Sequence, residues 1–163
     1  MDPSAAVLVC ALGLLGRSHA NAPVVLLPSP PPHASPNVEA FVQRDPDRIY
    51  LITSSAAFRE ASSERSPDRH EACRKMASII VHEEWHLAHG SNEREAYLAQ
   101  LTTLQMLGAT PETIGSVRKS MRAVAAAQEQ PRSVSLRPTS SSAASLDRRE
   151  MDQSWPRVPP LRR

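Results

Sequence analysis

The sequence has few aromatic residues and only two cysteines. Phe, Trp and Tyr make up 4% of its 163 residues, and there are 5 glycines against 15 prolines. Large aromatic side chains supply much of a hydrophobic core, and proline-rich stretches do not join one. We therefore expect one small domain, in a chain of which a large part lies outside the core.

Neither the charge of the chain nor its apolar run indicates nucleic acid or a membrane as a partner. The formal net charge is +2, which is too small to indicate binding to nucleic acid or to a membrane surface. The apolar run at residues 5–15 is too short to span a bilayer as a helix. We therefore predict no nucleic-acid partner and no transmembrane segment.

The first 22 residues have the layout of a secretory signal peptide. No Lys or Arg precedes the apolar run 5–15, but small residues follow it and offer a cleavage site after Ala20 or Ala22. We predict that residues 1–22 are a signal peptide and that the protein is exported; the alternative is an N-terminal helix packed on the domain. Cleavage would leave Cys73 as the only cysteine, without an internal disulfide.

Composition divides the rest of the chain into three parts. Residues 23–36 contain PSPPPHASP and are predicted to be an extended, proline-rich linker. Residues 37–128 carry the periodic apolar patterns and are predicted to form the domain. Residues 129–163 are rich in Ser, Pro and Arg without periodicity, and are predicted to be a disordered tail.

The predicted domain contains a His-Glu-x-x-His motif that begins at His82. Ser66 followed by Pro67 indicates the start of a helix, and Gly90 indicates its end. Residues four apart on a helix lie one turn apart on the same face. His82 and His86 can therefore bind one metal ion together.

Glu83 lies next to the first histidine, near enough to reach a water molecule on that metal ion. This spacing is typical of Zn²⁺ sites in which the metal polarises water and the glutamate takes its proton. Such chemistry is that of a metallopeptidase acting on a peptide or protein substrate. We therefore predict Zn²⁺ as the cofactor and Glu83 as the catalytic residue.

A catalytic zinc ion normally takes three protein ligands, so a third ligand is needed. Asn92 and Glu95 form a capping-box pattern that predicts a second helix over about residues 93–107. If this helix folds back beside the first, a carboxylate in its first turn can face the two histidines. Glu93 and Glu95 are candidates, and His89, on the same helical face as the two histidines, is another.

Residues 79–105 resemble the gluzincin group of zincin metallopeptidases, whose best-known member is thermolysin. In that group HExxH is followed, on the next helix, by a glutamate in a setting such as ExxAD or ExxAN, and residues 93–97 read EREAY. The string EREA also resembles the minimal peptidases that cleave phage repressors. The resemblance implies a compact zincin-like fold in which His82, His86 and Glu93 bind zinc.

The flanking segments complete the predicted fold. Residues 48–53 read as a strand, and the resemblance implies that residues 49–53 form a sheet edge to which substrate backbone pairs. Thr110 and Pro111 open a third helix, to about residue 128, whose apolar face covers the second helix. The predicted fold class is α+β, with one or two strands and then three helices around a zinc site.

Three hypotheses about function follow from these patterns. The first is an exported zinc-dependent metallopeptidase. The second keeps the zinc ion but uses it to pin two helices in a binding or interaction module. The third has no metal, and the helices form an interaction scaffold.

Overall fold

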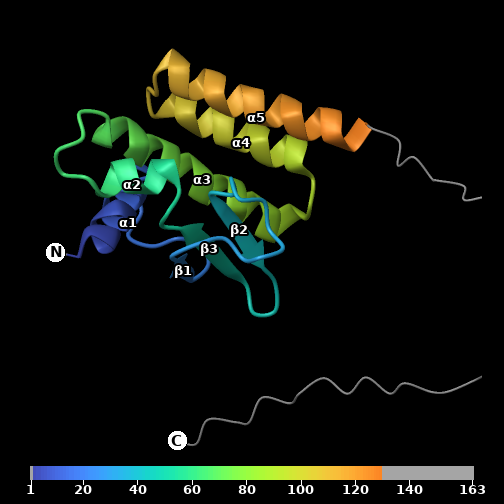
Figure 1. Cartoon of the computed structure of the whole chain (residues 1–163), viewed down its shortest axis with the longest axis horizontal. Helices are drawn as coiled ribbons and strands as arrows, with labels where there is room; N and C mark the ends of the chain where they lie inside the picture. Colours follow the sequence, from blue (N-terminus) through green and yellow to red (C-terminus); the bar gives the residue numbers. More distant parts are fainter. Residues whose placement is uncertain (1, 130–163) are drawn as a thin grey trace, which may run out of the picture. The chain divides into compact units, whose positions relative to one another are not determined.

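The structure is a computed structural model that describes residues 2–129. Within them it is a mixed α+β domain of five helices and a small three-stranded sheet, which confirms the predicted fold class and adds elements to it (Figure 1). The elements in chain order are α1 (Pro3–Leu14), β1 (Val24–Leu27), β2 (Ala40–Gln43), β3 (Arg48–Ile52), α2 (Ala56–Ser62), α3 (Arg69–His89), α4 (Glu93–Met106) and α5 (Pro111–Glu129).

Helix α3 lies at the centre of the domain and contacts α1, α2, α4 and two strands. It begins at Arg69, two residues after the predicted start, because Ser66 and Pro67 belong to a preceding turn in which Ser66 Oγ accepts a hydrogen bond from Asp68 N at 3.2 Å. Gly90 ends the helix as predicted, with a φ of +106° that favours glycine. The core around α3 includes Val7, Ala11, Ile49, Leu51, Phe58, Cys73, Met76 and Ile80.

The sheet has the strand order β1-β3-β2, with β1 parallel and β2 antiparallel to β3. The prediction that residues 49–53 form an edge was wrong, because β3 is the central strand and β2 is the edge beside α3. The prediction of a linker over residues 23–36 was wrong for Val24–Leu27. These four apolar residues pair with Ile49–Ile52, and the prolines around them obscured a short strand.

The N-terminal helix α1 packs against α2 and α3 in the full chain. Val7 and Ala11 are fully buried there, and Cys10 forms a disulfide with Cys73 of α3 across a Cα–Cα distance of 6.0 Å. The packed helix is thus the arrangement of the uncleaved chain, and cleavage remains a prediction. None of the helices within residues 2–129 has the length and apolarity needed to cross a membrane.

Glu84, the charged residue inside the HExxH motif, joins α3 to the segment between α1 and β1. Its side chain is only 7% exposed. One carboxylate oxygen pairs with Arg17 Nη1 at 2.6 Å, and the other accepts a hydrogen bond from Asn21 N at 2.7 Å. Glu84 therefore has a structural role on the side of α3 where α1 packs.

Helices α4 and α5 form the second layer, and their bounds agree with prediction to within one residue. Leu101 and Leu104 of α4 are buried against Val117 of α5, so the third predicted helix covers the second as expected. The predicted tail, residues 129–163, lies outside the described residues except for Glu129, the last residue of α5.

Candidate metal centre

Two helices bring the three predicted metal ligands together. His82 and His86 project from α3, and Glu93 projects from the first turn of α4. The two Nε2 atoms are 3.1 Å apart, and they lie 3.5 Å and 3.4 Å from the two carboxylate oxygens of Glu93. This His-His-Glu group could hold a metal ion, with ligand atoms that all lie within 4.8 Å of one another.

The short turn between α3 and α4 places Glu93 opposite the histidines. Gly90 turns the chain out of α3, and Asn92 caps α4 by accepting a hydrogen bond from Glu95 N at 3.4 Å. Glu93 is then the first residue of α4, where the helix dipole stabilises a negative charge. The capping pattern read from the sequence thus determines that this carboxylate lies at the first position of α4.

The same turn orients the ring of His86. His86 Nδ1 lies 2.7 Å from the carbonyl oxygen of Gly90. A carbonyl oxygen only accepts hydrogen bonds, so Nδ1 is the donor and the neutral ring carries its lone pair on Nε2. This is the nitrogen that faces His82 and Glu93, and it is the tautomer that a metal ligand requires.

The ring of His82 is held by aromatic packing. It lies edge-on to the ring of Tyr97, with centroids 4.7 Å apart, and edge-on to His86 at 4.8 Å. Its Nδ1 atom is buried and has no hydrogen-bond partner within the described residues. Tyr97 therefore acts as a support for the first histidine, a contact that the sequence did not predict.

The two other candidate ligands lie outside the group. Glu95 is exposed on α4. His89 is also exposed, where its ring stacks on Trp85 at 4.8 Å and its Nδ1 is 3.2 Å from the carbonyl oxygen of Trp85. Of the three ligands left open by the sequence, the structure brings only Glu93 to the histidines.

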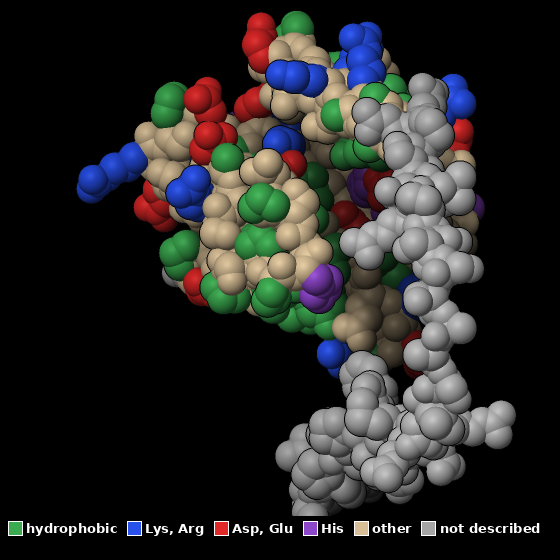
Figure 2. Space-filling model, turned by 45° about the vertical axis from the view of Figure 1, so that its right-hand side comes forward, with side chains coloured by type: hydrophobic (Ala, Val, Ile, Leu, Met, Phe, Trp, Pro, Cys, Tyr) green, Lys and Arg blue, Asp and Glu red, His purple; other side chains and the backbone are tan. Residues whose placement is uncertain are grey.

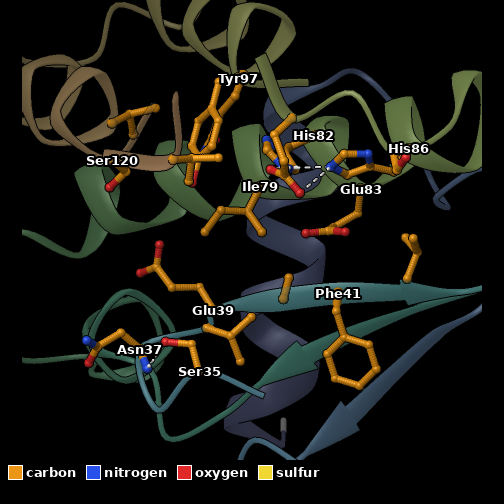
Figure 3. A pocket seen from close by; sticks show the side chains of 18 of the residues that line it. Ser35, Asn37, Glu39, Phe41, Ile79, His82, Glu83, His86, Tyr97 and Ser120 are labelled. Carbon is orange, nitrogen blue, oxygen red and sulfur yellow. Dashed lines mark hydrogen bonds and ion pairs between the residues drawn. The ribbon is translucent and has the colours of Figure 1, made fainter. Parts of the chain in front are cut away.

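Glu83 is buried next to the ligands and points into the space between α3 and β2 (Figure 3). Burial raises its pKa to about 7; the nearby His82 and His86 act to lower the value and Glu93 acts to raise it. A carboxyl group whose pKa is near neutrality is suited to both accepting and returning a proton.

Glu93 has the opposite electrostatic environment. The rings of His82 and His86, which can hydrogen-bond to its carboxylate when they are protonated, lower its pKa to about 2 despite its partial burial. The same interaction with Glu93 raises the pKa of His86. Glu93 is therefore ionised at neutral pH, as a carboxylate ligand must be.

A cleft of about 930 Å³ runs past the metal group. Its walls are the face of α3 that carries His82 and His86, residues between 35 and 44 in and beside β2, and parts of α4 and α5. Histidine and acidic side chains are visible inside a hollow of the surface in Figure 2, and Figure 3 shows Glu39 and Phe41 across from the histidines.

Sequence reasoning missed the β2 side of this cleft. Glu39 and Arg44, which flank β2, and Lys75 of α3 all line it. Lys75 is seven residues before His82, and residues at this spacing share one face of a helix. The sequence therefore could have placed Lys75 on the same face as the predicted metal ligands. No pattern in the sequence indicated that Glu39 and Arg44 lie near the site, because only the pairing of the strands brings them to α3.

Comparisons of the chain with protein-family models, with curated proteins and with solved structures found no match.

Proposed function

We propose that the protein is a zinc-dependent metallopeptidase of minimal gluzincin type. The observation that carries this proposal is the spacing of the three ligands. Tetrahedral zinc with bonds of about 2.0–2.1 Å separates neighbouring ligand atoms by about 3.4 Å. The separations between the histidine nitrogens and the carboxylate oxygens, 3.1, 3.4 and 3.5 Å, are close to that value.

The chemistry of the three ligands also suits zinc. Two imidazole nitrogens and one carboxylate are a common ligand set for catalytic zinc, and three protein ligands leave one position open. The two Nε2 atoms face each other at 3.1 Å, and a cation that accepts both lone pairs satisfies them at once. His82, His86 and Glu93 would therefore hold the ion.

When bound, zinc supplies Lewis acidity that lowers the pKa of water and polarises a carbonyl group. Glu83 is the residue of this chain that moves protons. Its buried carboxylate points into the cleft beside the ligands, where it accepts a proton from the attacking water and returns it to the departing amine. Burial of this group keeps bulk water from competing for the proton.

The edge strand β2 favours a peptide as the substrate. Ile52 N donates a hydrogen bond to Glu39 O across the antiparallel pair of β2 and β3. Hydrogen-bonded and non-hydrogen-bonded pairs alternate along such a pair of strands, so the N–H and C=O groups of Ala40 and Val42 point away from β3. Since β2 lines the cleft, these groups can pair with an extended peptide. This role, expected from the resemblance for residues 49–53, is proposed here for β2.

The test is the Glu83→Gln variant, examined for metal content and for hydrolysis of a mixed peptide library. We expect purified wild type to contain one zinc ion per chain and to cleave peptides. Glu83→Gln should keep the zinc and lose activity by at least about 10²-fold, because the general base is gone. Exposed Glu95→Gln is the matched control and should retain both properties.

Three results would contradict the proposal. Zinc-loaded wild type that cleaves no peptide would favour the alternative, a zinc-stabilised binding or interaction module. A Glu83→Gln variant with undiminished hydrolysis would show that another residue or a contaminant is responsible. A wild type without bound metal after zinc loading would favour the metal-free scaffold.

A further inference from the structure

Strand β2 is tied to α3 at both of its ends. Glu39, the residue before the strand, accepts an ion-pair hydrogen bond from Lys75 of α3, with Nζ–Oε1 at 2.7 Å. Arg44, the residue after the strand, donates from Nη2 to the carbonyl oxygen of His86 at 2.5 Å. The edge of the cleft is therefore attached to the helix that carries the metal ligands by two separate contacts.

The spacings of the two contacts match along strand and helix. Glu39 and Arg44 are five residues apart, which corresponds to about 16.5 Å of extended strand. Lys75 and His86 are eleven residues apart, which corresponds to about 16.5 Å of α-helix. Strand and helix thus run side by side in the same direction, and the segment between the contacts contains His82 and Glu83 (Figure 3).

Each contact is suited to its position. The side chains of Glu39 and Lys75 are 30% and 23% exposed, so their charges are partly shielded from solvent. Arg44 binds a carbonyl in the last turn of α3, where the helix dipole favours a cation. The strand itself is only four residues long and pairs on one side with β3, so these contacts restrain an edge that would otherwise fray.

We propose that Glu39, Lys75 and Arg44 are positioning residues that clamp β2 alongside the metal group. The clamp fixes the distance between the strand edge that pairs with peptide and the carboxylate of Glu83. It thereby sets where an extended peptide lies relative to the reacting atoms. The catalytic consequence rests on the proposed peptidase function, and the clamp itself does not.

The first test measures the clamp without enzyme activity. Hydrogen–deuterium exchange of residues 38–45 is compared in zinc-loaded wild type, Glu39→Lys, and the charge-swapped double variant Glu39→Lys/Lys75→Glu. We expect faster exchange in Glu39→Lys, where two lysines face each other, and recovery in the double variant, where the ion pair is restored with reversed polarity. The exposed Glu60→Lys on α2 is the control for an added positive charge.

The second test measures peptide hydrolysis by the same proteins. We expect Glu39→Lys to raise KM roughly two- to fivefold, with kcat changed less and zinc content unchanged, and the charge-swapped variant to return toward wild type. Arg44→Ala should raise KM similarly, while Arg44→Lys, which retains a donor, should raise it less. A residue that touched the substrate directly would not be rescued by the charge swap.

The outcomes separate this inference from the proposed function. Equal exchange of residues 38–45 in wild type and Glu39→Lys, or faster exchange that the double variant does not reverse, would overturn the clamp. Loss of activity without change in KM, or without rescue, would overturn its role in substrate placement. If wild type hydrolyses no peptide, the proposed function fails and the exchange experiment still decides the clamp.

Discussion

At the scale of single residues, the metal group depends on which polar atoms each neighbour supplies. The carbonyl oxygen of Gly90 holds His86 through Nδ1, so Nε2 is left available to bind a metal ion. Glu93 lies at the first position of α4, where both histidines and the helix N-terminus favour its charge. Glu95, two positions further on, has similar chemistry but lies outside the group.

This difference between two glutamates gives a prediction about metal affinity. Glu93→Gln should weaken zinc binding by more than about 100-fold. Replacing a residue that only hydrogen-bonds to a metal ligand already lowers metal affinity by about 10- to 100-fold, and loss of a ligand should lower it further. Competition with a zinc-binding dye measures the affinity. Glu95→Gln should bind as wild type does, and equal losses in the two variants would mean that Glu93 is not the third ligand.

At the scale of elements, α5 packs on α4 through apolar side chains and is attached to α3 by a carboxylate. Glu71 of α3 accepts a hydrogen bond from Thr110 N at 2.7 Å, just before α5 begins, and one from Arg74 at 2.9 Å. Burial raises the pKa of Glu71, but the hydrogen bonds from Thr113, Thr110 and Arg74 outweigh it and lower the pKa below 4.5. The ionised form is therefore the one that stabilises the contact between α3 and α5.

The direction of this pKa shift predicts how stability depends on pH. A group whose pKa is lower in the folded than in the unfolded state stabilises the fold above its unfolded value, near 4.5, and loses this contribution as pH falls. Glu71→Gln should be less stable than wild type at pH 7, and the difference should shrink below about pH 4.5. Urea unfolding at several pH values measures it, and a difference that does not vary with pH would contradict the assignment.

At the scale of the whole molecule, the N-terminal helix is joined to α3 by a disulfide and by buried apolar side chains. The disulfide from Cys10 to Cys73 spans 63 residues of sequence, and the buried side chains of Val7 and Ala11 pack in the same place. A chain cleaved after Ala20 would lose all of these contacts. The disulfide and the predicted signal cleavage therefore exclude each other in one mature molecule, and the intact mass of exported protein distinguishes them.

The disulfide gives a prediction about the stability of the uncleaved chain. Closing a loop of this length reduces the entropy of the unfolded state, so reduction should lower the free energy of unfolding by about 2–4 kcal/mol. Thermal unfolding with and without a reductant measures the effect. The double variant Cys10→Ser/Cys73→Ser should unfold like the reduced protein and should not respond to the reductant; a response would point to another cause.

Local patterns in the sequence were enough to predict α3, α4 and α5 and the two histidines of the His-His-Glu group. Helical spacing places His82 and His86 on one face, and the glycine and asparagine signals that end one helix and cap the next depend on neighbouring residues only. Those signals restricted the third ligand to a few residues. They did not choose between Glu93, Glu95 and His89, because direction in space depends on how α4 packs back on α3.

Only the tertiary structure determined the contacts between residues that are far apart in the sequence. Strand order made β2 the edge and β3 the centre, Glu39 and Arg44 reached α3 only through the sheet, and Cys10 met Cys73 only through the packing of α1. Periodicity reports which face of an element is buried, but not which element buries it. The spacing of the two histidines was therefore determined locally, whereas the choice of Glu93 and the shape of the cleft depended on how the elements pack together.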